Sequence, residues 1–303
     1  AQGARQVRPR RASPGARGEA LIQLKYRHSF HAGNFADVHK HVTLLALLTA
    51  LKKKDKGFLY LDTHAGRGSY DLSGAPPEAA AGIGRFLEAA PGAAELERYA
   101  EVVADFRARH AGRALYPGSP LIAAAELRPQ DRAVFVEKQP AEAHALESAL
   151  GPLAASVRIE RGDGFERLRA WLPPPERRGL IFLDPPYEET RADFARVTEA
   201  IAGGLRRFAT GVFAAWYPIK EERASAGWQA ELARSVSAPV LASELWLYPR
   251  DSRVALNGSG LLIVNPPYLT AERMQVWLPE LLQCLAAGPS AGSSVRMLSQ
   301  SAT

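Results

Sequence analysis

The chain has 303 residues, of which 47% are hydrophobic, and its formal net charge is +6. This length fits one elaborated α/β domain or two small ones. The single cysteine, Cys284, excludes an internal disulfide framework and a cysteine-based zinc cluster. No apolar run approaches the roughly 20 residues that a membrane-spanning helix requires. We therefore expect a cytoplasmic protein without membrane attachment.

The first 20 residues carry most of the net charge, because they contain five arginines and one glutamate. Two interpretations are open. The segment could steer RNA through phosphate attraction, or it could be a solvated extension, since a segment rich in Gly, Pro and Arg cannot build a core. We predict that residues 1–22 form a flexible basic extension and that one domain covers residues 23–285.

The first predicted element is a helix over residues 34–54, whose leucines give it an apolar side. A short apolar strand at 58–62 follows and ends in a glycine turn. The next stretch, rich in Ala, Glu and Arg, predicts helices within 75–112, and another helix is predicted at 120–127. Six further strands are predicted, at 133–136, 156–160, 180–183, 211–216, 241–248 and 260–264. Residues 286–303 are rich in Ser, Gly and Ala and are predicted to be a flexible tail.

Strands that alternate with helices predict an α/β fold, with a mostly parallel sheet covered by helices on both faces. Ligands bind such sheets at the carboxyl ends of the strands. Four acidic residues fall at predicted strand ends, namely Asp62, Glu137, Asp163 and Asp184. We therefore expect these four side chains to border one ligand site.

The motif Asp184-Pro185-Pro186-Tyr187 predicts chemistry on an amino group of a base. The lone pair of the adenine N6 amine is delocalised into the ring, so an enzyme must position the amine. A carboxylate and a proline carbonyl can each accept one of its N–H bonds. The tyrosine ring can stack on the base. The competing interpretation is a proline-ended strand with a buried aromatic side chain.

A second copy of the motif, Asn265-Pro266-Pro267-Tyr268, also follows an apolar strand. Asparagine could replace aspartate in this role. However, the glycine turn and the acidic strand ends lead directly to Asp184, and Asn265 lies two or three strands later. We therefore interpret the second copy as a structural strand end.

The segment from Asp62 to Gly68 has the pattern Asp-x-x-Ala-Gly-x-Gly, which suits a cofactor-binding loop because glycines let the backbone approach a ligand. The six-residue pattern of nicotinamide-binding folds is absent. Glu137 suits a ribose diol, or it is only a surface acid. Asp163 suits the amino group of a cofactor adenine and also suits an N-cap of the following helix, and both can hold together.

The histidines gather early, at His28, His31, His39, His41 and His64. A metal site is conceivable, but no cluster of Cys, Asp or Glu supplies a known ligand spacing, so we predict no metal. Lys40 beside His41 either contacts a phosphate or the cofactor carboxylate, or lies on a solvated helix face.

The chain resembles the RlmJ family, bacterial 23S rRNA adenine-N6 methyltransferases. The resemblance runs from about Tyr26 to about residue 285. It rests on several contiguous motifs: Tyr26-Arg27-His28-Ser29-Phe30-His31-Ala32-Gly33-Asn34 with Asp37 and Lys40-His41, Leu61-Asp62-Thr63-His64-Ala65-Gly66, Tyr116-Pro117-Gly118-Ser119-Pro120 and Asp184-Pro185-Pro186-Tyr187. Phe35 departs from the family pattern, in which a polar residue is common there.

The resemblance implies a Rossmann-like class I methyltransferase fold with an inserted helical subdomain at about 72–115. It implies S-adenosyl-L-methionine as the methyl donor, consumed in the reaction. The implied cofactor contacts are His41, His64, Ser119, Glu137, Asp163, Gly164 and Asp184. Asp184 is implied to be the proton-accepting catalytic residue. The expected substrate contacts are Tyr26, Lys40, Pro185, Pro186 and Tyr187. The implied substrate is free or incompletely assembled 23S rRNA, and we expect the enzyme to act as a monomer.

Two alternatives stay open at this point. A DNA adenine methyltransferase could use the same motif, although such an enzyme would usually carry a separate recognition domain. A non-catalytic RNA-binding protein with a degenerate methyltransferase fold is the other alternative. The intact Asp184 and the intact glycine turn argue against it.

Overall fold

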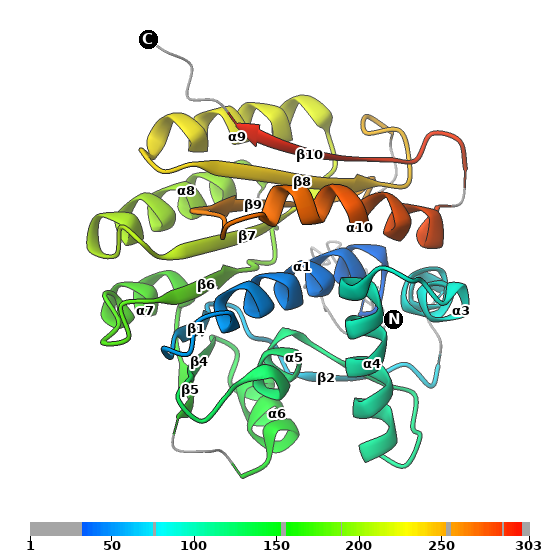
Figure 1. Ribbon diagram of the computed structural model, residues 1–303, viewed down its shortest axis with the longest axis horizontal. Coiled ribbons are helices and arrows are strands. Elements are labelled where there is room, and N and C mark those ends of the chain that lie inside the picture. Colours follow the sequence, from blue (N-terminus) through cyan, green and yellow to red (C-terminus); the bar gives the residue numbers. More distant parts are fainter. Residues whose placement is uncertain are drawn as a thin grey trace, which may run out of the picture.

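The computed structural model describes residues 32–74, 77–152, 156–188, 190–252, 256–286 and 288–298. Its centre is an eight-stranded sheet with the spatial order β10-β8-β9-β7-β6-β1-β4-β5 (Figure 1). The strands of this sheet are β1 (Leu59–Asp62), β4 (Arg132–Glu137), β5 (Val157–Arg161), β6 (Gly179–Leu183), β7 (Val212–Ile219), β8 (Val240–Trp246), β9 (Gly258–Val264) and β10 (Gly292–Leu298).

Five neighbouring strands, from β5 through β4, β1 and β6 to β7, run parallel. β9 is antiparallel to both β7 and β8, and β10 is antiparallel to β8. The strand order reverses at β1, where Leu61 lies beside Val134 of β4 on one side and Ile181 of β6 on the other. Ligands of such sheets bind at this reversal, outside the carboxyl ends of the strands. The predicted α/β fold is confirmed.

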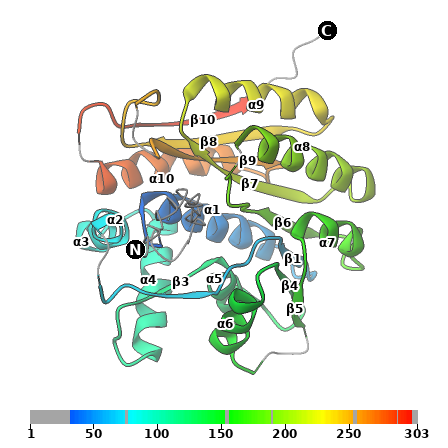
Figure 2. The same ribbon diagram turned by 180° about the vertical axis from the view of Figure 1, so that it is seen from behind.

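Helices cover both faces of the sheet. The face turned forward in Figure 1 carries α1 (Phe35–Lys52), α5 (Ser119–Glu126) and α10 (Thr270–Leu285), and α6 (Pro140–Leu150) lies beside β4 and β5. The opposite face, seen in Figure 2, carries α7 (Gly164–Trp171), α8 (Thr190–Arg207) and α9 (Glu222–Ser235). Each layer has its own cluster of buried hydrophobic side chains, so the sheet separates two cores.

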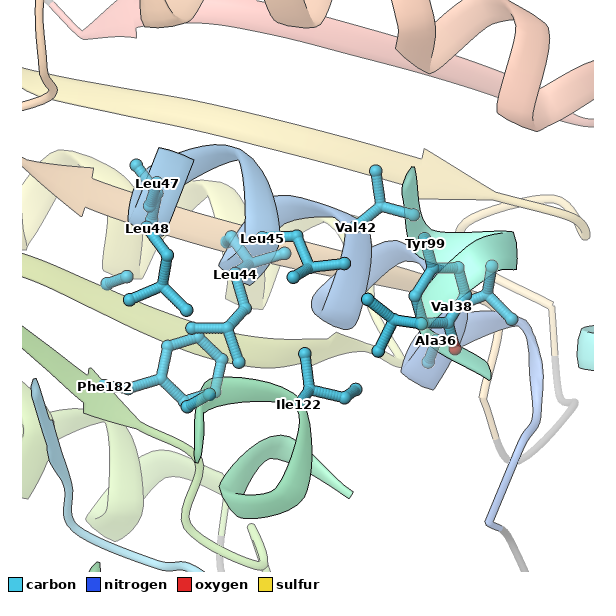
Figure 3. Close-up of a cluster of buried hydrophobic side chains, with 14 of the residues drawn as sticks. Ala36, Val38, Val42, Leu44, Leu45, Leu47, Leu48, Tyr99, Ile122 and Phe182 are labelled. Atoms are coloured by element: carbon cyan, nitrogen blue, oxygen red, sulfur yellow. The ribbon is translucent and has the colours of Figure 1, made fainter. Parts of the chain in front are cut away.

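Helix α1 is buried along nearly its whole length and forms the centre of one core. It starts at an N-cap, because the Asn34 side chain accepts hydrogen bonds from two backbone N–H groups of the first turn, each at 3.0 Å. Figure 3 shows Leu44 above Phe182 of β6, and Val38 beside Tyr99. The buried residues of α1 include polar ones, among them Asp37, His39 and Lys40. Its polar side chains are therefore held in fixed positions.

The stretch between β1 and α5 is helical, as predicted. It contains α2 (Pro77–Ala79), a π-helical turn η2 (Ala80–Gly84), α3 (Arg85–Ala89) and α4 (Ala94–Arg109), and it is bracketed by the antiparallel pair β2 (Ser69–Asp71) and β3 (Leu115–Pro117). Phe86 and Tyr99 of this stretch belong to the same core as α1 and α10. A separate helical subdomain at 72–115 therefore stays a prediction.

The prediction of a flexible tail over residues 286–303 is wrong for residues 292–298. These form β10, which pairs with β8 along its whole length. Arg296 anchors the strand, because its guanidinium lies 3.0 Å from the carboxylate of Glu244, a side chain only 2% exposed. A strand with one covered face usually alternates between apolar and polar side chains. The sequence of β10 lacks this alternation, so the strand is not recognised from the sequence. Residues 1–22 and 299–303 lie outside the described residues.

None of the helices in the described part of the chain combines the length and the apolar character that crossing a membrane requires.

Candidate active site

The four predicted acids lie at one edge of the sheet. Asp62 and Glu137 are the last residues of β1 and β4, Asp163 follows β5 by two residues, and Asp184 follows β6 directly. Their strands are parallel neighbours, so their carboxyl ends meet. The strand reversal at β1 places this edge where ligands of such sheets bind.

Asp184 forms a buried ion pair with Lys40 of α1. The Lys40 Nζ lies 2.6 Å from Asp184 Oδ2 and 2.8 Å from Asp37 Oδ1. Burial alone would lower the pKa of Lys40, but the two carboxylates raise it above its usual value, so the ammonium is charged. The alternative of a solvated helix face is wrong, because the Lys40 side chain is 4% exposed. Its contact with a phosphate or with the cofactor carboxylate stays a prediction. Lys40 fixes the carboxylate of Asp184.

Asp62 connects β1 to the start of α5. Its Oδ2 accepts hydrogen bonds from the Ser119 hydroxyl at 2.8 Å and from the Tyr60 hydroxyl at 3.1 Å, and its Oδ1 accepts one from the backbone N–H of His64 at 3.2 Å. The side chain is fully buried, and this burial raises its pKa from 3.8 to about 6. Asp62 therefore orients Ser119, a predicted cofactor contact.

The glycine loop after β1 is tied to Glu137. Gly66 donates its backbone N–H to Glu137 Oε2 at 2.8 Å, and Gln139 donates its own to Oε1 at 2.7 Å. Gly66 and Gly68 have φ values of +66° and +80°, which favour glycine. A carboxylate held at the mouth of such a loop suits the hydroxyls of a ribose, and these residues fit a nucleoside cofactor.

Asp163 is the N-cap of α7, because its Oδ1 accepts a hydrogen bond from the backbone N–H of Phe165 at 3.1 Å. Lys138 and Arg196 also approach Asp163 Oδ2, at 3.2 and 3.3 Å. Burial raises its pKa, but these contacts outweigh burial and lower it overall. A Cβ on Gly164 would lie 1.9 Å from the backbone oxygen of Thr63, so only glycine lets α7 approach β1 this closely.

The two histidines predicted at the cofactor lie in different surroundings. His41 is 2% exposed, and its Nδ1 lies 2.8 Å from the Tyr116 hydroxyl. His64 follows β1, its Nδ1 lies 2.8 Å from Thr63 Oγ1, and its ring meets Phe165 edge-on. Burial lowers the pKa of His64 to about 4, so its imidazole is neutral at pH 7. Their contact with a cofactor stays a prediction.

Tyr187 does not offer its ring for stacking. Its side chain is 2% exposed, its hydroxyl donates to the backbone oxygen of Trp216 at 2.5 Å, and its ring packs edge-on against Phe194 and Trp216. The expectation that Tyr187 stacks on the substrate base is therefore corrected. This ring belongs to the core below the turn. The predicted substrate contacts Pro185 and Pro186 form the turn itself, which follows β6 at the same edge as Asp184.

The second motif copy lies at the opposite edge of the sheet. β9 runs antiparallel to β7, so Asn265 is near the start of β7. The Asn265 side-chain amide donates to the backbone oxygens of Ala209 and Gly211 at 2.8 and 2.9 Å. The interpretation of Asn265-Pro266-Pro267-Tyr268 as a structural strand end is confirmed. Tyr26, a predicted RNA contact, lies outside the described residues.

Other features of the described residues lie apart from this edge. No group of three or more His, Cys, Asp or Glu side chains there is arranged to hold a metal ion. A cavity of about 370 Å³ opens between α1, α4 and α5. Lys52, at the carboxyl end of α1, lines it, and no predicted site residue does.

Comparison with known proteins decides the family. The model of the family "Ribosomal RNA large subunit methyltransferase D, RlmJ" matches residues 55–298. The chain belongs to the RlmJ family. The Ribosomal RNA large subunit methyltransferase J of Escherichia coli K12 is 42% identical over 262 residues, which cover 85% of this chain and 92% of that protein. Its namesake from Haemophilus influenzae is 39% identical over 272 residues, covering 86% and 94%.

Among solved structures, protein LPL1258 from Legionella pneumophila has a TM-score of 0.79 and 35% identity, and the match covers 88% of this chain and 98% of that chain. This RlmJ family member is thus a methyltransferase with a Rossmann-like class I fold, whose donor is S-adenosyl-L-methionine.

Sequence reasoning assigned no role to two residues at the site of this RlmJ family member. Asp37, the second carboxylate on Lys40, lies three positions before it on α1, a helical spacing that could have revealed the pair. Trp216 lies in the middle of β7, and its ring centre is 5.5 Å from the Lys40 Nζ. Its nearness to Asp184 depends on strand register, which the sequence does not state.

Proposed function

We propose that this protein methylates the exocyclic N6 of a specific adenine in 23S ribosomal RNA. The observation that supports it most is the Asp184-Pro185 turn at the carboxyl end of β6, with its carboxylate fixed by Lys40. Among the described residues, Asp184 Oδ2 is engaged by Lys40, and Oδ1 accepts no hydrogen bond. A carboxylate oxygen and a proline carbonyl at one turn match the two N–H bonds of an adenine amine.

S-adenosyl-L-methionine supplies a sulfonium methyl group, and its transfer to N6 leaves S-adenosylhomocysteine. Glu137 would hold the ribose of this cofactor, and Asp163 its adenine amine. His41, His64, Ser119 and Gly164 would complete its site, together with Asp184. We propose no metal.

On the substrate side, Asp184 and the Pro185 carbonyl orient the amine, so that its lone pair points at the methyl group. Asp184 accepts the N6 proton during or after transfer. Pro186 stiffens the turn, because its ring fixes φ and it has no N–H to compete with the carbonyls. Tyr26 is proposed as a further RNA contact. The target adenine must leave its stack to reach the turn, at a cost of a few kcal/mol.

The relatives are named for the large ribosomal subunit, and this name supports 23S rRNA as the substrate. We propose that the enzyme acts in the cytoplasm, as a monomer, on free or early-assembly 23S rRNA.

The test is transfer of a labelled methyl group from S-adenosyl-L-methionine to protein-free 23S rRNA, 16S rRNA and duplex DNA, with Asp184→Ala as the control. We expect label on 23S rRNA alone, recovered as N6-methyladenine and lost in the variant. Label on DNA would keep the chemistry and overturn the substrate. Absence of label on every nucleic acid would overturn the proposal.

A further inference from the structure

The position of Tyr187 leaves the stacking surface for the target base unassigned. An unstacked adenine needs an aromatic or apolar face beside the group that holds its amine. The Tyr187 ring is enclosed by Phe194 and Trp216 and has 2% exposure. The surface must therefore come from another residue near Asp184.

Trp216 lies level with Asp184 on the neighbouring strand. In the register of β6 and β7, Leu183 pairs with Ala215, so the next residues along the two parallel strands are Asp184 and Trp216. Ala215 and Tyr217 on either side are fully buried, whereas Trp216 is partly exposed. Its side chain packs on the α1 side of the sheet, where Ser259 of β9 meets it. Trp216 thus offers a partly exposed aromatic ring at the edge of the sheet that carries Asp184.

Both the indole and the catalytic carboxylate lie against the same ammonium group. The Lys40 Nζ is 2.6 Å from Asp184 Oδ2 and 5.5 Å from the centre of the Trp216 ring. Because both groups lie around one nitrogen atom, the ring and the carboxylate are within reach of a single base. A purine whose amine is held at Asp184 can therefore lie along the indole.

The indole is also fixed in place. Its Nε1 donates to the Ser259 hydroxyl at 2.9 Å, and that hydroxyl lies 3.0 Å from Nδ1 of the buried His39. The other His39 nitrogen lies 3.0 Å from the Ser243 hydroxyl, so the chain of contacts reaches β8. The Tyr187 hydroxyl holds the Trp216 backbone from the other side. A ring fixed in this way loses little conformational entropy when a base stacks on it.

We propose that Trp216 is a substrate-binding residue on which the target adenine stacks while Asp184 holds its amine. This inference rests on the proposed function. It gives Tyr187 a supporting role, in which its hydroxyl holds the strand that carries the indole.

The test compares Trp216→Leu and Trp216→Phe in methyl transfer to protein-free 23S rRNA. Base stacking on an aromatic side chain predicts a fall in kcat/KM of about 10- to 100-fold for the leucine variant, and a much smaller fall for phenylalanine, which keeps a ring. The dissociation constant of S-adenosyl-L-methionine, measured by calorimetry without RNA, should stay within about twofold. The matched control is Trp246→Leu, a partly exposed tryptophan on β8, which should keep its kcat/KM.

A second measurement covers the case in which Trp216→Leu fails to fold. Addition of 23S rRNA should quench the indole fluorescence of the unmodified enzyme. The conservative Trp216→Phe variant should lose part of this quenching, and Trp246→Phe should retain it.

An unchanged kcat/KM in Trp216→Leu, or full quenching in Trp216→Phe, would overturn the role of Trp216 while leaving the proposed function intact. Absence of methyl transfer by the unmodified enzyme would remove both.

Discussion

Two turns of this chain share one short pattern, a polar residue followed by two prolines and a tyrosine, and the fold uses them in opposite ways. The turn at Asp184 ends a parallel strand at the edge where ligands bind, and its carboxylate faces a buried lysine. The turn at Asn265 ends the antiparallel β9 at the other edge, and its amide binds two backbone oxygens. Tyr187 is 2% exposed, and Tyr268 is 85% exposed.

The difference teaches that strand direction, rather than the motif itself, decides which copy can act. Carboxyl ends of parallel strands meet at one edge, so Asp184 joins Asp62 and Glu137 there. The antiparallel β9 carries the similar turn at Asn265 to the opposite edge, away from these acids. In the second turn the polar side chain satisfies backbone carbonyls and so stabilises the turn.

The sharpest test of this contrast is Asp184→Asn, which makes the first turn a chemical copy of the second. An asparagine oxygen could still hold the amine, but the amide cannot accept the N6 proton, so we expect the rate of methyl transfer to fall by about 10²–10⁴-fold. Single-turnover assays with labelled S-adenosyl-L-methionine would measure this, with Asn265→Ala as the matched control. A variant that kept more than a tenth of the rate would contradict the role of Asp184.

The second test removes the cation behind the first turn. Lys40→Met leaves two buried carboxylates without their ammonium, so the free energy of unfolding should fall by about 3–5 kcal/mol. Urea denaturation would measure it. Lys52→Met is the matched control on the same helix. Its partner Glu126 keeps a second cation, Arg98, and the loss should stay within about 1 kcal/mol. Equal losses in the two variants would argue against a special environment at Lys40.

The third test uses pH, to which Asp62 at the first edge should respond and Asn265 at the second should not. Burial raises the pKa of Asp62 from 3.8 to about 6, so the folded state binds this proton more tightly than the unfolded state. Ionising Asp62 therefore costs the folded state about 3 kcal/mol above pH 6, and this cost disappears as the pH falls from 6 to below 4.

Relative to Asp62→Asn, the unmodified protein should gain about this much stability between pH 7 and pH 4. Urea denaturation across that interval would measure the gain. The difference between unmodified protein and Asn265→Ala should be flat over the same interval, because an amide does not titrate. A flat difference for Asp62→Asn would contradict the raised pKa.

The smallest effects are expected in the second turn. Asn265→Ala leaves two backbone oxygens without their donor and should cost about 1–3 kcal/mol of unfolding free energy, with no change in methyl transfer. Tyr268→Ala removes an exposed ring and should change stability by less than about 0.5 kcal/mol. Thermal unfolding and the methyl-transfer assay would measure both. A loss of activity in either variant would show that this edge takes part in the reaction.

Sequence reasoning located the edge of the sheet well, because an acid directly after a short apolar run is a local pattern. Asp62, Glu137 and Asp184 were found in this way. It also ranked the two turns correctly, because chain order separates Asn265 from the glycine loop. These predictions needed only the direction and order of strands.

The predictions that failed concern partners distant in the sequence. Lys40 and Asp184 are 144 positions apart in the sequence, and no residue near Lys40 indicates that a carboxylate from the end of β6 lies beside it. Tyr187 was expected to face the base, but the left-handed backbone at its φ of +48° turns its ring into the core. Trp216 was missed because its relevance follows from the register of β6 and β7.

Strand β10 has a consequence for the making of the protein. It is synthesised after every other described strand, and until it emerges from the ribosome the open side of β8 presents unpaired backbone groups. Nascent chains with such an edge can pair with one another and aggregate. The seven residues Gly292–Leu298 therefore cover the backbone of β8 only at the end of synthesis, and a chain that ends just before them would leave β8 as an unpaired edge strand.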